Sequence, residues 1–204
     1  MGENIKAVLF DLDHTLVDTN PEYKLKVLNN ALSSFGKSAT LEETQYFWLN
    51  HDRERIIEEK GILMKDFWNK FYEFDDVVKR GKSTYAYPDA VSLLGKISGK
   101  YSLGIITNAP LNVAIEEVKC IGFDFDVVLS ANDIPKPNPH YLIKACEELN
   151  VSPVEAIYFG DDLTDMIAAK NANIKGVLVD RGFKETNGYS PKIFSLIEAI
   201  DLIV

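Results

Sequence analysis

Short apolar runs recur along the chain, and each of them ends in a group of polar residues. The runs contain valine, isoleucine, leucine and phenylalanine with little alternation, which is typical of strands buried on both faces of a parallel sheet. We expect strands at Ile5–Phe10, Tyr101–Ile106, Phe125–Leu129, Ala156–Phe159 and Gly176–Val179.

Helix-length segments with apolar residues three and four positions apart follow these runs. They are Asp89–Ser98, Asn112–Ile121, Pro139–Leu149 and Leu163–Ala172. Such alternation predicts the α/β class, here a doubly wound parallel sheet of the Rossmann-like kind. Because ligands of these sheets bind at the carboxyl ends of the strands, the polar residues after each run are the first candidates for chemistry.

The connection from Val17 to Pro88 interrupts this rhythm, since it contains helical patterns and no strand-like run. Residues 21–87 hold 12 of the 22 aromatic residues (9 Tyr, 11 Phe and 2 Trp). Two apolar stripes have helical spacing: Leu25, Leu28, Leu32 and Phe35, and then Met64, Phe67, Trp68, Phe71 and Tyr72. We interpret the second stripe as the core of a small helical bundle rather than as a substrate pocket. The prediction is a core formed by residues 1–16 and 88–204, with a helical domain, 17–87, inserted into it.

Composition narrows the possible partners. The 204 residues include 22 Lys and Arg against 31 Asp and Glu, a net charge of −9, which makes nucleic acid and anionic membranes unfavourable partners. Cys120 and Cys146 form neither a disulfide framework nor a zinc motif, and we expect them to be small buried residues. No apolar run approaches 18 residues, and Met1–Lys6 lack the apolar core of a signal peptide. We therefore expect a cytoplasmic protein. Its assembly is left open between a monomer and a homodimer.

Acidic residues gather at two expected strand ends. Asp11 and Asp13 close the first strand, and Asp161, Asp162 and Asp165 follow the fourth. Neighbouring carboxylates beside a buried strand are unfavourable unless a cation lies between them. Oxygen-rich sites of this kind suit Mg²⁺. If both clusters lie at the same edge of the sheet, they predict a magnesium site.

The other strand ends supply groups that bind a phosphoryl group. Thr107 and Asn108 follow the second strand, and Lys136 lies shortly before the helix expected from Pro139. Mg²⁺ and this lysine would offset most of the charge of the acidic clusters. A carboxylate nucleophile can then approach a phosphoryl group in spite of their mutual repulsion.

The order of these motifs resembles that of the haloacid dehalogenase superfamily, in its phosphatase branch with a helical cap, similar to phosphoglycolate phosphatase. The resemblance covers the chain outside the insertion and rests on Asp11-Leu12-Asp13-His14-Thr15, Ile106-Thr107, Lys136 and Gly160-Asp161 with Asp165. It implies a phosphatase that hydrolyses small phosphorylated metabolites through an aspartyl phosphate. Asp11 would be the nucleophile and Asp13 the general acid/base. Thr107 and Lys136 would bind the phosphoryl group, with Asn108 as a further candidate.

The resemblance also implies a Mg²⁺ cofactor and a sheet order. Asp11, Asp161 and the backbone carbonyl of Asp13 would hold the metal, and Asp165 would order either the water shell of the metal or Lys136. The strand order 5-4-1-2-3 of the superfamily would place Asp11 beside both Thr107 and Asp161. The helical insertion would be the cap that closes over small substrates.

Less specific interpretations stay open for several of these residues and for the function. Asp162 is best explained as the N-cap of the helix from Leu163. Asn108 is equally compatible with a turn, and we expect His14 to face the cap or the solvent rather than a metal. A sugar-phosphate mutase, a phosphonatase or dehalogenase of the same superfamily, and a non-catalytic receiver-like binding module remain alternatives. Asp13 argues against a dehalogenase, because dehalogenases lack the second aspartate of the first motif.

Overall fold

The computed structural model describes residues 4–50, 52–184, 186 and 188–204. The chain divides into two compact units. One comprises the chain up to Asp18 together with Tyr85–Val204, and the other comprises Thr19–Thr84. These divisions lie a few residues inside the expected boundaries at 16/17 and 87/88. The first half of Met1–Lys6, on which the signal-peptide argument rests, lies outside the described residues.

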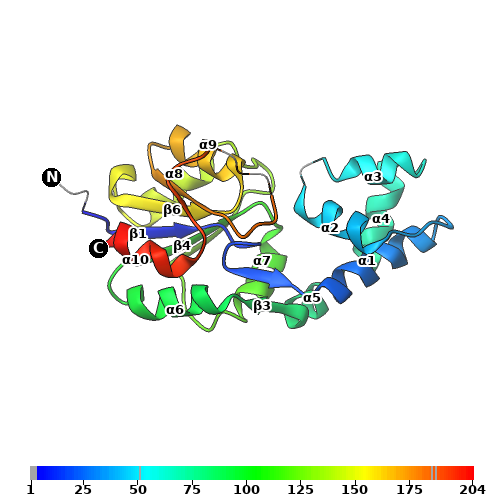
Figure 1. Cartoon of the computed structure of the whole chain (residues 1–204), viewed down its shortest axis with the longest axis horizontal. Coiled ribbons are helices and arrows are strands. Elements are labelled where there is room, and N and C mark those ends of the chain that lie inside the picture. Colours follow the sequence, from blue (N-terminus) through cyan, green and yellow to red (C-terminus); the bar gives the residue numbers. More distant parts are fainter. Residues whose placement is uncertain (1–3, 51, 185, 187) are drawn as a thin grey trace. The chain divides into compact units, whose positions relative to one another are not determined.

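The first unit contains a parallel sheet whose described strands follow the order β5-β4-β1-β6-β7-β8 (Figure 1). The strands are β1 Ala7–Phe10, β4 Ser102–Thr107, β5 Val127–Ser130, β6 Ala156–Gly160, β7 Lys175–Val179 and β8 Lys192–Ile193. β1 pairs with β4 on one side and with β6 on the other. The predicted fold class is confirmed, and so is the central place of the strand that leads to Asp11. β8 was not predicted, because two residues are too short to form a recognisable pattern.

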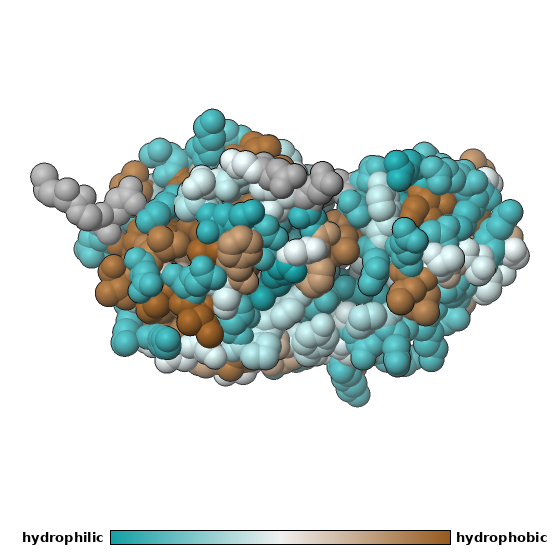
Figure 2. Space-filling view, in the orientation of Figure 1, coloured by the Kyte–Doolittle hydropathy of each residue, from teal (hydrophilic) through white to brown (hydrophobic). Residues whose placement is uncertain are grey.

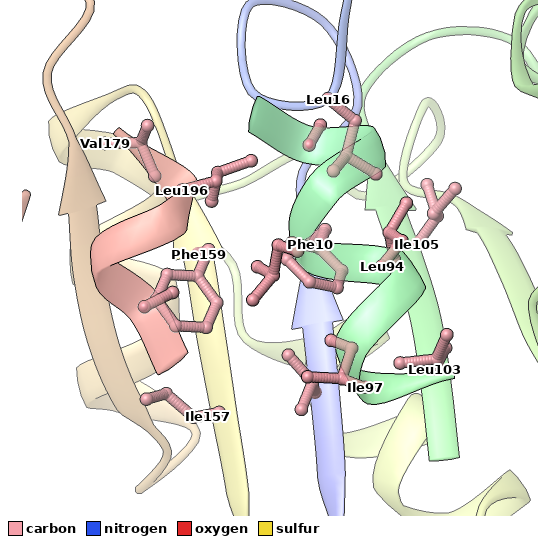
Figure 3. Packing of buried hydrophobic residues seen from close by; sticks show 14 of the residues in the cluster. Phe10, Leu16, Leu94, Ile97, Leu103, Ile105, Ile157, Phe159, Val179 and Leu196 are labelled. Atoms are coloured by element: carbon pink, nitrogen blue, oxygen red, sulfur yellow. The ribbon is translucent and has the colours of Figure 1, made fainter. Parts of the chain in front are cut away.

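Helices cover both faces of this sheet, because successive side chains of a buried strand point to opposite sides. Val8 and Phe10 pack on one side with α6 (Pro88–Ile97), and Figure 3 shows Phe10 together with Leu94 of that helix. Leu9 and Tyr158 pack on the other side with α8 (His140–Glu148) and α9 (Leu163–Asn171). The helices of this unit are α6 Pro88–Ile97, α7 Leu111–Val118, α8 His140–Glu148, α9 Leu163–Asn171 and α10 Ile200–Ile203, with 3₁₀ turns η1 Pro153–Glu155 and η2 Leu196–Ala199.

The second unit is helical and has its own apolar core. Its helices are α1 Pro21–Ser33, α2 Leu41–Leu49, α3 Glu54–Glu59, α4 Met64–Phe74 and α5 Val77–Ser83. Phe67 and Phe71 of the predicted stripe pack against Phe47 and Leu28, so the interpretation of this stripe as a bundle core is confirmed. Tyr72 is 64% exposed and does not belong to that core. Much of the surface of this unit drawn in Figure 2 is hydrophilic.

The expectation that no strand lies between Val17 and Pro88 is wrong. β2 Val17–Thr19 and β3 Thr84–Ala86 pair in a two-stranded ribbon where the chain leaves the first unit and returns to it. The hydroxyls of Thr19 and Thr84 are hydrogen-bonded across this ribbon at 2.9 Å. Three-residue strands contain too few positions to show a period of two, which explains why the apolar pattern did not reveal them.

Two expectations from composition can be compared with the structure. Cys146 is buried and Cys120 is partly buried, both as free thiols, and burial raises the pKa of each to about 11. The expectation of a small buried residue is confirmed for Cys146, whereas Cys120 packs against the core but is only partly buried. Over the described ranges, the chain contains no helix with the length and apolar character needed to cross a bilayer.

Candidate active site

The sheet register places the predicted site residues at one edge. Phe10 of β1 lies opposite Ile105 of β4 and Phe159 of β6. Thr107 and Asp161 therefore leave the neighbouring strands at nearly the same level as Asp11. The Asp11 N–H donates to the Phe159 carbonyl at 2.8 Å, which extends the pairing by one residue and holds the start of the turn.

Lys136 lies between two of the predicted carboxylates. Its Nζ is 2.6 Å from Asp11 Oδ1 and 2.6 Å from Asp165 Oδ1. It also donates to the Ile106 carbonyl at 3.2 Å and lies 3.0 Å from the Tyr158 hydroxyl. All three charged side chains are at most 9% exposed. Burial strengthens these ion pairs, and it also makes the loss of any one partner costly.

Electrostatics at Asp11 favour an additional cation. Burial raises the pKa of the Asp11 carboxyl well above its ordinary value, Lys136 opposes this shift, and Asp165 and Asp161 add to it. Burial alone would lower the pKa of Lys136, but Asp11 and Asp165 raise it well above its usual range, so the lysine is charged. One lysine shared between two acids only partly stabilises the ionised form of Asp11, so a further cation beside it would be favourable.

Asn108 and Thr107 have defined places beside this cluster. The Asn108 side-chain oxygen accepts a hydrogen bond from the Lys136 N–H at 3.0 Å. Asn108 therefore ties the loop that carries the lysine to the end of β4. The Thr107 side chain is buried, and its hydroxyl accepts the N–H of Ala109 at 3.1 Å. This bond occupies one acceptor site of the Thr107 hydroxyl, which can still donate its own hydrogen.

Asp162 and Asp165 form a capping box at the start of α9. The Asp162 carboxylate accepts the N–H of Thr164 at 2.8 Å, and Asp165 Oδ2 accepts the N–H of Asp162 at 3.1 Å. The N-cap interpretation of Asp162 is thus confirmed. Asp165 has a double role, because its other oxygen contacts Lys136 and accepts a hydrogen bond from the Tyr158 hydroxyl at 3.0 Å.

Gly160 makes room for the Asp165 carboxylate. A Cβ at position 160 would lie 2.5 Å from Asp165 Cγ and 2.6 Å from Oδ2, which is closer than real contacts allow. The glycine before Asp161 is therefore explained by the packing of a carboxylate against the backbone.

Gly160→Ala is expected to lower the free energy of unfolding by about 1–3 kcal/mol, because the clash displaces Asp165 or the strand. Gly95→Ala is the matched control, since its Cβ would meet only Phe123 at 3.8 Å. Gly95 lies inside α6, where alanine is expected to stabilise the protein by about 0.5–1 kcal/mol. Urea denaturation of both variants measures these changes. An unaltered stability of Gly160→Ala would contradict the packing explanation.

Lys184 was not predicted as a site residue, although it lies beside Asp161. Its Nζ is 2.8 Å from Asp161 Oδ2 and 2.8 Å from Asp162 Oδ2. Burial alone would lower its pKa, but these two carboxylates raise it. Burial raises the pKa of Asp161, Lys184 opposes that shift, and Asp165 adds to it. The parallel strand β7 ends at the same edge of the sheet, and Lys184 lies in the loop that follows it. The expectation that polar residues after a strand carry the chemistry therefore also applies to Lys184.

The donor set fits a hard divalent cation. Carboxylate oxygens of Asp11, Asp161 and Asp165 lie within 4.8 Å of one another. Donors of the chain engage both oxygens of Asp165 at 2.6–3.1 Å, whereas the Thr15 hydroxyl contacts Asp11 Oδ2 only weakly, at 3.5 Å. Asp11 and Asp161 are therefore the better candidates for direct ligands. Asp13 lies in the turn that follows and is half-buried, with a β-bridge to Val17.

One expectation about the first motif needs correction. His14 is not solvated, because its side chain is buried and only 7% of the residue is exposed. Its Nε2 lies 3.5 Å from Asp18 Oδ1, and the ring meets Phe183 edge-on. The backbone has a φ of 60°, in the left-handed region, and this turn directs the side chain inward.

Tyr158 was also missed by the sequence analysis. It is fully buried within β6, and its hydroxyl contacts Asp165 at 3.0 Å and the Ile106 carbonyl at 3.3 Å. Burial raises the pKa of this tyrosine well above its usual value, and Asp165 adds to the shift. The available signal was a tyrosine inside an otherwise apolar strand, since a buried phenol needs a hydrogen-bonding partner.

Comparisons with known proteins identify the family of the chain. The family model described as haloacid dehalogenase-like hydrolase matches residues 8–179. Phosphoglycolate phosphatase of Nitrosospira multiformis is 30% identical over 203 residues, covering 89% of this chain and 86% of the relative. Phosphoglycolate phosphatase of Psychrobacter arcticus is 29% identical over 195 residues, covering 87% and 84%.

A solved structure shares the whole architecture. It is a provisionally named phosphoglycolate phosphatase from Lactobacillus plantarum, 26% identical, with a TM-score of 0.79. The comparison covers 99% of this chain and 100% of that one. The chain therefore belongs to the haloacid dehalogenase-like hydrolase family, and it is a hydrolase of the phosphatase type, similar to the phosphoglycolate phosphatases.

Proposed function

We propose that the protein is a Mg²⁺-dependent phosphatase that hydrolyses small phosphomonoesters through an aspartyl phosphate on Asp11. The observation that carries this proposal is the buried contact of Asp11 with Lys136, beside Asp161, at the carboxyl end of β1. This arrangement offers a nucleophile, a fixed positive charge and an acidic oxygen set within one small volume.

Each of the site residues has its own role in the proposed reaction. The Asp11 carboxylate attacks phosphorus, forming a bond to it as the bond to the leaving oxygen breaks. Asp13 gives its proton to that oxygen and then takes one from the water that hydrolyses the intermediate. Lys136 and the Thr107 hydroxyl hold the phosphoryl oxygens, and Asn108 holds Lys136.

Mg²⁺ would be held by Asp11 and Asp161, with the backbone carbonyl of Asp13 as a further ligand. When bound, it would supply positive charge that offsets the repulsion between the phosphate and the carboxylates. Asp165 serves Lys136 rather than the metal, in keeping with its contacts.

We infer that the substrate is a small phosphorylated metabolite and that the helical insertion acts as the cap that selects it. The relatives named phosphoglycolate phosphatase make short phosphorylated acids the first substrates to test. The net charge of −9 makes a polyanionic substrate such as nucleic acid a poor alternative.

Phosphate release from a panel of small phosphate esters tests this proposal. We expect turnover with Mg²⁺, its loss in EDTA, recovery when Mg²⁺ is restored, and poor recovery with Ca²⁺, whose larger coordination shell misplaces the reacting groups. Full activity in EDTA would contradict the assignment of the acidic cluster. An absence of turnover across the panel by the folded protein would contradict the proposed activity itself.

Lys184→Met is expected to tighten Mg²⁺ binding about tenfold. The positive charge of Lys184 lies beside Asp161, one of the proposed ligands. The charges of this lysine and of Mg²⁺, a few ångströms apart, repel each other by roughly 1.5 kcal/mol even at the dielectric constant of water. Calorimetric titration of the protein with Mg²⁺ measures the change. Lys144→Met removes an equal charge from the surface of α8 and serves as the control. Weaker binding by Lys184→Met would show that the lysine supports the metal site.

A further inference from the structure

Arg181 is a largely buried arginine outside the motifs described above. It follows β7, and its side chain is 10% exposed. The guanidinium lies 3.7 Å from the centre of the Tyr87 ring and forms two ion-pair hydrogen bonds with Asp89, at 3.1 and 3.2 Å. Its remaining donors reach the first motif, because Nε donates to the His14 carbonyl at 3.0 Å and Nη2 to the Thr15 carbonyl at 2.7 Å.

Asp89 is itself held in place by the fold. It accepts hydrogen bonds from the Ser195 hydroxyl at 3.0 Å and from the Leu196 N–H at 2.9 Å. Burial would raise its pKa, but the bonds from Arg181 and Leu196 lower it below its ordinary value, so the carboxylate is charged. Arg181 is thus braced against the beginnings of α6 and η2, which pack in the layer that covers one face of the sheet.

The turn that Arg181 contacts is the one that carries Asp13. On its inner side the Leu12 carbonyl accepts the N–H groups of Thr15, Leu16 and Val17, at 3.3, 2.9 and 3.1 Å. Arg181 binds the two carbonyls that follow Asp13 in this turn, those of His14 and Thr15. His14, which directly follows Asp13 in this turn, has a backbone in the left-handed region with a φ of 60°. A non-glycine residue in that region needs surrounding contacts to keep its conformation.

We propose that Arg181, braced by Asp89, is a positioning residue that fixes the turn after Asp13 and thereby aligns the Asp13 carboxyl for proton transfer. The inference rests on the proposed role of Asp13 as general acid/base. A residue that only linked β7 to α6 would affect the stability of the protein. Its loss would not slow the reaction more for a leaving group that needs a proton than for one that does not.

The test compares Arg181→Gln with the wild type on an alkyl phosphate and on nitrophenyl phosphate, in rapid-mixing experiments with Mg²⁺. A small misplacement of a catalytic group lowers rates by up to about 10²-fold. We expect phosphoenzyme formation from the alkyl ester to fall by about 10–100-fold, and formation from the nitrophenyl ester, which does not need a proton, by less than about threefold. KM should change little.

A double-mutant cycle with Asp13→Asn makes the test specific. Once Asp13 is removed, Arg181→Gln should have no further effect on the nitrophenol burst or on the residual alkyl-ester rate. Arg181→Lys retains charge without the forked geometry and should give an intermediate loss. It also keeps the test available if Arg181→Gln does not fold. Lys192→Gln is the control, because it breaks a 3.0 Å contact with Asp180, the neighbour of Arg181 in the chain. It should leave the ratio of the rates with the two esters unchanged.

Different outcomes would contradict the positioning role of Arg181 and the proposed phosphatase activity. Lower thermal stability with an unchanged substrate ratio, or a full additional loss in the Asp13→Asn background, would overturn the role of Arg181 while leaving a phosphatase. A folded wild type that hydrolyses neither ester would overturn the proposed function, and the positioning role with it.

Discussion

Asp11→Asn is expected to form no phosphoenzyme with any phosphate ester, because it removes the carboxylate that attacks phosphorus. Asn retains an oxygen that can accept the hydrogen bond now made by Lys136 at 2.6 Å, so the fold should be preserved. Activity should fall to the background rate, and intact-mass measurement of rapidly quenched protein should show no adduct.

Asp13→Asn is expected to behave differently with different leaving groups. An alkyl phosphate leaves as a basic alkoxide and needs a proton from Asp13, whereas nitrophenolate leaves without one. Hydrolysis of the intermediate still needs a base, whose contribution is about 10²–10⁴-fold. Asp13→Asn given nitrophenyl phosphate should therefore release a burst of nitrophenol and then stall with a phosphoryl group on Asp11.

Asp162→Asn is the control for these two substitutions. Asparagine caps a helix about as well as aspartate, so the start of α9 is preserved and turnover should continue. An adduct on the Asp11→Asn protein, or normal turnover of both substrates by Asp13→Asn, would show that the roles are assigned wrongly.

The parts of the fold that were predictable are those that depend on long apolar patterns. β4 and β6 are buried along most or all of their length, so their sequences contain almost no polar interruption. The order of strands around β1 came from a resemblance and not from periodicity. Nothing in the spacing of apolar residues specifies which strands are neighbours.

The parts that were missed depend on single contacts between distant segments. Lys184 contacts Asp161 from a loop that follows a different strand. Tyr158 contacts Lys136 and the Ile106 carbonyl, which are 22 and 52 positions away along the chain. Arg181 contacts His14 across 167 positions of the chain. Such pairs produce no periodic pattern in the sequence. A single polar residue in a loop is common, and its partner is determined by the tertiary fold. Each of these residues nevertheless lies in or after a strand that leads to the predicted edge.

Lys136→Met is expected to remove activity and to destabilise the protein. Lys136 holds a phosphoryl oxygen in the proposed mechanism, and loss of one such preorganised donor lowers kcat by about 10²–10³-fold. It also leaves the carboxylates of Asp11 and Asp165 buried near each other without their shared cation. Removing one partner of a buried ion pair costs about 3–5 kcal/mol.

The loss of stability should depend on pH in a defined direction. Burial already raises the pKa of Asp11 in the wild type, and Lys136 opposes that shift, so its removal raises the pKa further. A carboxyl whose folded pKa lies above its unfolded value stabilises the fold at low pH, and this contribution is lost as the pH rises through the folded pKa. Urea denaturation in EDTA should therefore show a smaller deficit at pH 5.5 than at pH 8.

Adding Asp165→Asn to Lys136→Met separates the electrostatic cause from the loss of packing. The double variant has one buried carboxylate fewer, so much of the stability lost at pH 8 should return, while activity should not. Coupling between contacting residues of this kind is typically about 0.5–3 kcal/mol. If the two substitutions instead destabilise the protein additively at both pH values, the aliphatic stem of Lys136 and not its charge holds this part of the site together. A single Lys136→Met protein as stable as the wild type at pH 8 would show that Asp11 and Asp165 do not depend on the lysine at all.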